Sequence, residues 1–136
     1  MRIVSGLAGA LFLTACGQPQ PAAEQPDTAP SASQTATAQR PPAFQQCAVC
    51  HADTPGAPRR SGPNLHGVMG SKAGTVPADF AFSDGMKKAG FTWDRAKMDA
   101  FIENPAVVVP GTRMVFRGEK DPARREAIVD YLETLK

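Results

Sequence analysis

The order of apolar and polar positions divides the chain into three parts. A short apolar run at residues 3–13 follows a minimal basic start, and it is too short to span a bilayer, which takes about 20 residues. Residues 17–42 then contain Pro, Ala, Gln, Thr and Ser with almost no large apolar residue. Such a stretch cannot bury enough surface to offset the entropy lost on ordering it. Only residues 43–136 have the pattern of a folded unit.

Short helices and loops are expected in the first half of that unit. A helix over residues 43–50 has Phe44 as its apolar anchor, and the Pro-, Gly- and Arg-rich stretch 52–63 predicts a loop. A second short helix over residues 83–89 can be closed by Gly90 as a C-terminal cap.

Two longer helices are expected in the second half. Thr92 can cap a helix over residues 93–103, which Asn104-Pro105 stops. Residues 107–112 are expected to form an extended turn, and the last helix begins at Asp121-Pro122. The apolar faces of the two helices are Met98, Phe101 and Ile102, and Ala127, Ile128, Tyr131, Leu132 and Leu135. Without any alternating strand pattern, the predicted fold class is all-α, with long loops.

Charge and cysteine content narrow the possible functions. The net charge is only +2 and its signs are interspersed, so nucleic-acid binding is not indicated. Leu13-Thr14-Ala15-Cys16 resembles a bacterial lipobox, in which the chain is cut before a cysteine that then carries lipid. We therefore expect a signal peptide at residues 1–15, a lipid-anchored disordered linker at 16–42 and a domain at 43–136. Ordinary cleavage near Ala15, with Cys16 incidental, is the alternative.

The main chemical signal is Cys47-Ala48-Val49-Cys50-His51. A CxxCH unit on a helix brings two thiols to one haem and places the next imidazole near the iron, so Cys47, Cys50 and His51 predict one covalently bound haem c. A thioredoxin-type pair expects a βαβ setting, and a zinc site needs about four ligands. A plain disulfide leaves His51 unexplained.

Residues 43–136 resemble the class I c-type cytochromes of the mitochondrial and c2-like kind. Four stretches beyond the CxxCH unit carry the resemblance, in the same order and at similar spacing: residues 62–67, residues 83–93, Asn104-Pro105 with residues 109–114, and Tyr131-Leu132. The resemblance implies the small cytochrome c fold, with short helices and long loops wrapped around one haem.

The resemblance also implies site residues. Met114 would be the second axial ligand beside His51, the Pro63 carbonyl would accept a hydrogen bond from His51, and the Trp93 indole would bind a haem propionate. Met69, Met86, Met98 and His66 are the competitors for the iron, and a core aromatic is the alternative for Trp93. We expect His66 to hold its loop by a hydrogen bond.

With both axial positions filled by protein, the expected function is single-electron transfer and not catalysis. The lipobox and the linker predict a protein tethered to the periplasmic face of a bacterial membrane, with the inner membrane favoured, and we expect a monomer. There it would carry electrons between respiratory complexes, from a quinol–cytochrome c reductase to a terminal oxidase. The partners follow from the resemblance alone. The alternatives are a dedicated haem subunit of one oxidase or dehydrogenase, and a peroxidase-type enzyme in which Met114 leaves the iron.

The chain departs from the family at several polar positions. Phe82 and Phe101 stand where many members have tyrosine, Ser71 where many have arginine, and Met86 where many have asparagine. Groups around a metal ligand tune its strength. A haem potential typical of the family is therefore not assumed.

Phe101→Tyr is expected to change the strength of methionine ligation, because it restores a hydroxyl that many relatives direct at the methionine sulfur. The measurement is the midpoint of the alkaline ligand switch in the ferric protein. An unchanged midpoint would count against a tuning role for this position.

Overall fold

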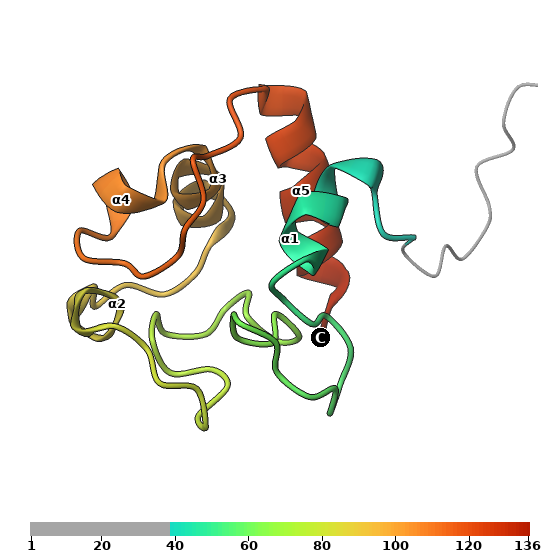
Figure 1. Ribbon diagram of the computed structural model, residues 1–136. Helices are drawn as coiled ribbons and strands as arrows, with labels where there is room; N and C mark the ends of the chain where they lie inside the picture. Colours follow the sequence, from blue (N-terminus) through green and yellow to red (C-terminus); the bar gives the residue numbers. More distant parts are fainter. Residues whose placement is uncertain (1–38) are drawn as a thin grey trace, which may run out of the picture. The chain divides into compact units, whose positions relative to one another are not determined.

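The computed structural model describes residues 39–136. The expected signal peptide, Cys16 and most of the expected linker lie outside these residues. A 3-10 turn, η1 (Pro42–Phe44), leads into α1 (Gln45–Ala48), and α2 (Asp84–Lys88), α3 (Arg95–Glu103), α4 (Pro105–Val108) and α5 (Pro122–Thr134) follow. The only β-type pairing within the described range is one bridge between Lys72 and Thr92. The predicted all-α class with long loops is confirmed (Figure 1).

Three of the predicted helices form close to the expected bounds. Ser83 caps α2 and Gly90 follows its end with a φ of 73°. Asp121 caps α5 through the Ala123 N–H, with Pro122 in the first turn. A proline is tolerated there because the first N–H groups of a helix have no partner within it.

The start of α3 corrects one prediction. Asp94, and not Thr92, is the cap: its Oδ1 accepts the Lys97 N–H at 2.7 Å. Thr92 is held in the bridge to Lys72, so its backbone is committed to an extended pairing before the helix begins.

Two further helix predictions are also corrected. The expected helix over residues 43–50 is a 3-10 turn followed by the four residues of α1. The expected extended turn begins instead with α4, because Asn104 ends α3 while Pro105 opens a new helical turn. The Asn104 carbonyl accepts from the Val107 N–H at 3.2 Å and from the Val108 N–H at 3.3 Å.

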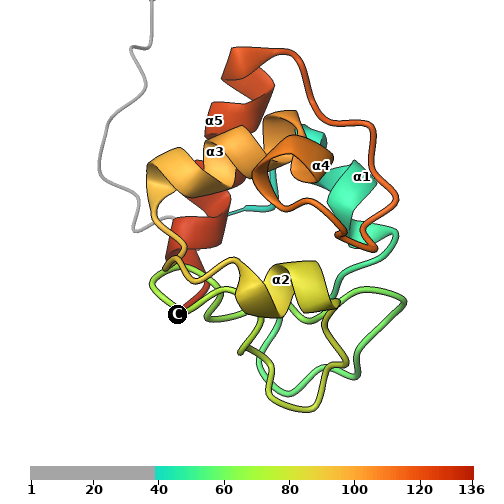
Figure 2. The same cartoon turned by 90° about the vertical axis from the view of Figure 1, so that its left-hand side faces the viewer.

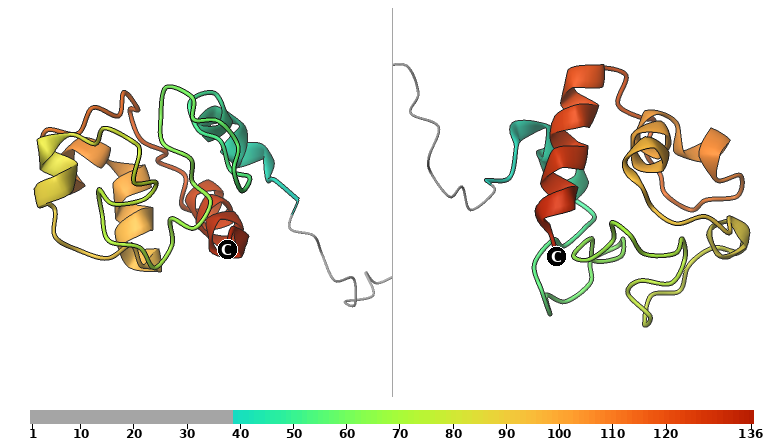
Figure 3. Two further views of the ribbon diagram at one scale, coloured as in Figure 1. Left: turned by 90° about the horizontal axis from the view of Figure 1, so that it is seen from below. Right: turned by 180° about the vertical axis from the view of Figure 1, so that it is seen from behind.

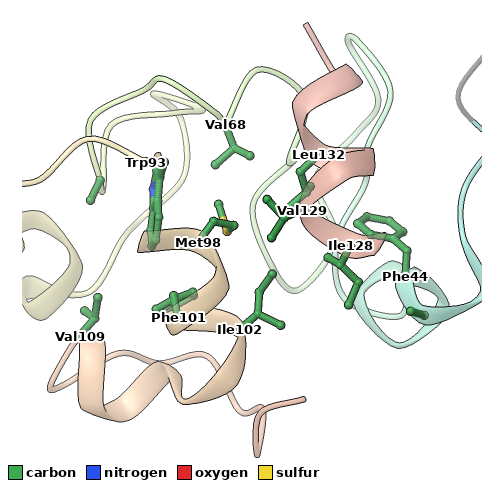
Figure 4. Close-up of a cluster of buried hydrophobic side chains, with 12 residues drawn as sticks. Phe44, Val68, Trp93, Met98, Phe101, Ile102, Val109, Ile128, Val129 and Leu132 are labelled. Carbon is green, nitrogen blue, oxygen red and sulfur yellow. The ribbon is translucent and has the colours of Figure 1, made fainter. Parts of the chain in front are cut away.

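The core lies between α3, α5 and η1, as Figure 4 shows. Met98, Phe101 and Ile102 of α3 are buried as predicted. The buried apolar residues of α5 are Ile128, Val129 and Leu132. Val129 was not expected there. Within the described part of the chain, no helix is long and apolar enough to cross a bilayer.

The entry of the chain into the domain is held by a buried carboxylate. Asp53, only 5% exposed, accepts two hydrogen bonds from Arg40 at 2.7 and 2.8 Å and one from the Tyr131 hydroxyl at 2.8 Å. The Tyr131 ring packs edge-on against Phe44 with 4.8 Å between centroids. Contacts with the domain therefore begin ahead of residue 43. Figures 1 and 3 show that the chain enters on the side away from α2 and α4.

Arg40→Ala is expected to lower the free energy of unfolding by about 2 kcal/mol at neutral pH. Removing one partner of a fully buried ion pair costs ~3–5 kcal/mol. The expected loss of unfolding free energy is smaller here because the Arg40 side chain is 39% exposed. Urea titration of the full chain measures it, with Arg59→Ala as the control.

The same ion pair predicts a pH dependence. Burial raises the pKa of Asp53, but hydrogen bonds from Tyr131 and Arg40 outweigh burial and hold that pKa below its ordinary value. The stabilisation is therefore present above the unfolded-state pKa of about 3.9 and is lost as the pH falls through the lower folded-state pKa. The difference in unfolding free energy between wild type and Arg40→Ala should become smaller in acid. A difference that stays constant with pH would show that the stabilisation does not come from the ionised Asp53.

Candidate haem-binding site

The two cysteines of the CxxCH unit are separate thiols. Cys47 lies in α1 and Cys50 just beyond it, where the Cys47 carbonyl accepts the Cys50 N–H at 3.1 Å and the His51 N–H at 2.9 Å. Burial raises the pKa of Cys47 to about 11. A redox-active CxxC thiol has a lowered pKa instead. Among the described residues, no group of three or more His, Cys, Asp and Glu side chains could hold a metal ion. Neither the thioredoxin-type nor the zinc alternative gains support.

The His51 ring has the predicted hydrogen bond. Its Nδ1 lies 2.7 Å from the Pro63 carbonyl oxygen. Burial lowers the pKa of His51 below its ordinary value, although the Pro63 contact opposes the shift, so the imidazole is neutral at pH 7. A neutral ring that donates from Nδ1 carries its lone pair on Nε2, which is the atom free to bind a metal.

Gly62 makes room for this ring. A Cβ added to Gly62 would lie 2.5 Å from His51 Cε1, closer than real side-chain atoms come. The Gly62 N–H also donates to the Cys50 carbonyl at 2.8 Å. Arg60 adds a second contact between this loop and the CxxCH unit, since its Nη1 donates to the Ala48 carbonyl at 2.6 Å. The loop at residues 60–63 thus encloses the CxxCH unit.

Asn64 takes the role expected of His66. Its side-chain amide donates to the Thr54 carbonyl at 2.8 Å and to the Ala57 carbonyl at 3.3 Å, and its Oδ1 accepts the His66 N–H at 2.9 Å. No hydrogen bond of the His66 ring is found within residues 39–136. His66 takes part in this loop through its backbone N–H, and the shorter Asn64 amide is the side chain that reaches the loop carbonyls.

Met114 lies in the middle of a segment that joins α3 to α5. Residues 104–121, named here the Met114 segment, include α4 and run back past α3 to the start of α5 (Figures 1 and 2). Met114 is half-buried against the core, and its N–H donates to Thr112 Oγ1 at 3.2 Å.

Contacts on the α2 side hold the Met114 segment. Arg113 donates to the Ala81 carbonyl. A Cβ added to Gly85 of α2 would collide with the Pro110 carbonyl oxygen. Backbone therefore packs directly on backbone at this point, which requires glycine.

Trp93 provides a further test of whether the site suits a haem. It is 5% exposed and packs edge-on against Phe91 and Phe101, with centroid distances of 4.8 and 5.0 Å. Among the described residues no buried side-chain nitrogen or oxygen lacks a hydrogen-bond partner, so the indole N–H is not an orphaned buried donor, and its bond to a propionate stays a prediction. The two free thiols and the neutral imidazole are the observations that fit a haem.

Sequence reasoning did not find every residue that shapes the site. Gly62 carried a signal only as the residue before Pro63. Neither Arg60 nor Glu119 was singled out. Their contacts join segments that are distant in sequence.

Comparison with known proteins agrees with this geometry. No protein-family model matches the chain. The chain is 48% identical to cytochrome c2 of Rhodomicrobium vannielii over 91 residues, which cover 67% of the chain and 72% of the relative. It is 45% identical to cytochrome c2 iso-2 of Magnetospirillum fulvum over 98 residues, covering 72% of the chain and 100% of the relative.

A solved structure gives the same result. Cytochrome cH from Methylobacterium extorquens superposes with a TM-score of 0.64 at 43% identity, covering 68% of this chain and 91% of that one. The chain therefore belongs to the cytochrome c2 family of class I c-type cytochromes, electron carriers with one haem attached covalently, here through Cys47 and Cys50.

Proposed function

We propose that the protein is a lipid-anchored electron carrier in which His51 and Met114 would both bind the haem iron. A bound haem supplies an iron that alternates between ferrous and ferric states. The observation that carries the assignment is the 2.7 Å contact between His51 Nδ1 and the Pro63 carbonyl. This contact fixes the ring so that Nε2 is its metal-binding atom.

The setting of Met114 supports it as the second ligand. Its segment is held against α2 on one side and against the end of α3 on the other. Met98, by contrast, is buried in the α3 core. A thioether is a soft donor that stabilises ferrous iron and raises the reduction potential. With His51 and Met114 both bound, a haem iron would have no place for a substrate, so the chain would pass electrons only.

The anchor and the partners rest on the sequence and on the relatives. Cys16 stands where a short apolar run meets a polar stretch, and residues 16–39 would then form the tether. The bacterial cytochrome c2 relatives favour a periplasmic location. We propose redox partners in the inner membrane, a quinol–cytochrome c reductase as donor and a terminal oxidase as acceptor. Because the chain enters the domain away from α2 and α4, a tether would leave the Met114 segment accessible.

Met114→Ala is expected to remove the sulfur ligand and lower the reduction potential on the order of 0.2 V, within the roughly 0.8 V range that axial ligands span. Redox titration and the ferric spectrum measure the effect, and added imidazole should bind the variant readily. Met86→Leu and Met98→Leu are the matched controls. A ferric spectrum that changes in a control but not in Met114→Ala would show that another methionine is the ligand.

Cys16→Ser is expected to release the protein from the membrane fraction into the soluble periplasmic fraction without changing its absorption spectrum. The reason is that a lipid on Cys16 would be the sole anchor. Fractionation of cells that express wild type and variant measures the distribution. Wild-type protein in the soluble fraction would instead support ordinary cleavage near Ala15.

A further inference from the structure

Both ends of the Met114 segment meet at the C-terminal end of α3. The segment leaves α3 at Asn104 and returns at Glu119, whose N–H donates to the Ile102 carbonyl at 2.9 Å. Lys120 Nζ donates to the Glu103 carbonyl at 2.7 Å. At Gly118 the two backbones touch, since a Cβ there would overlap the Glu103 carbonyl oxygen. The returning chain thus binds carbonyls that the end of a helix leaves without partners.

Glu119 connects the end of the Met114 segment to α1, the helix that carries Cys47. Its Oε2 accepts from Gln46 Nε2 at 3.0 Å and from Arg124 Nε at 2.8 Å, and its Oε1 accepts the Asp121 N–H at 3.1 Å. The side chain is only 14% exposed. Hydrogen bonds from Arg124 and Gln46 lower the pKa of Glu119 to about 2, so the carboxylate is ionised at neutral pH. Gln46 directly precedes Cys47 in α1.

Arg125 holds the backbone at Glu119 and Lys120 through a separate set of contacts. Its Nη1 donates to the Glu119 carbonyl at 3.1 Å and to the Lys120 carbonyl at 3.0 Å, while its Nε donates to Asp99 of α3 at 2.9 Å. These contacts tie Glu119 to α3 and α5. The contact with Gln46 has a different consequence, because it joins the Met114 segment to α1, the helix that carries Cys47.

We propose that Glu119 is a positioning residue which, through Gln46, couples the helix bearing Cys47 to the segment bearing Met114 and so slows the departure of Met114 from the iron. This inference rests on the proposed ligation by Met114. Glu119 does not touch the iron or the haem in this role. It restrains the far end of the segment, so that the segment cannot swing away from α1 without breaking a hydrogen bond to an ionised carboxylate.

The test uses the haem-loaded full chain and imidazole as the probe. Imidazole can bind ferric iron only after Met114 leaves, so its binding rate at saturating imidazole reports that departure. Gln46→Ala and Glu119→Ala should each raise the limiting rate about tenfold, which matches the lower range for a hydrogen bond to a charged group. The double variant should add little, because both changes remove the same contact. Glu119→Gln, which keeps an acceptor oxygen, should recover part of the wild-type rate.

Glu133→Gln is the matched control. Glu133 of α5 pairs with Arg95 of α3 at 2.9 Å, so its loss also weakens an ion pair at α5 but involves neither α1 nor the Met114 segment. The control should leave the limiting rate unchanged. If Gln46→Ala accelerates imidazole binding no more than Glu133→Gln does, the positioning role is overturned while ligation by Met114 stands. If Met114→Ala leaves the ferric spectrum of the wild type unaltered, both proposals fail together.

Discussion

The hydrogen bond between the His51 ring and the Pro63 carbonyl is the contact on which the geometry of the site depends. At 2.7 Å and largely out of water, it holds one tautomer and one orientation of the ring. Gly62 enables it, because any side chain at that position would occupy the space of the imidazole. The Gly62 N–H in turn binds the Cys50 carbonyl. The loop therefore fixes the haem-attaching cysteine and the neighbouring histidine as one unit.

The Met114 segment is also restrained by close contacts that depend on glycine. Gly85 and Gly118 allow backbone to pack directly on backbone at the two flanks of Met114, against Pro110 and Glu103 respectively. Neither glycine has room for a Cβ, so the segment lies close against α2 and against the end of α3. Residues restrained in this way would keep the surroundings of a bound haem nearly the same in both oxidation states, which suits an electron carrier.

Two of the expected departures from the family pattern have defined neighbours in the structure. Phe101 packs on Trp93 where many relatives place a hydroxyl, and the Ser71 hydroxyl is used by the Val68 carbonyl. Ser71 nevertheless supports the site through its backbone, because its carbonyl accepts the Trp93 N–H at 2.9 Å. The tryptophan is thus positioned by main-chain bonding and ring packing.

The sequence by itself determined the CxxCH unit, the apolar faces of α3 and α5 and the cap of α5, because each depends on residues a few positions apart. The cap of α3 could not be read in this way, since Thr92 was already engaged with Lys72. Only the tertiary structure decided the partners of Asp53 and Glu119, which lie 78 residues from Tyr131 and 73 from Gln46. A buried carboxylate needs donors, but which distant donors reach it is settled by how the helices pack.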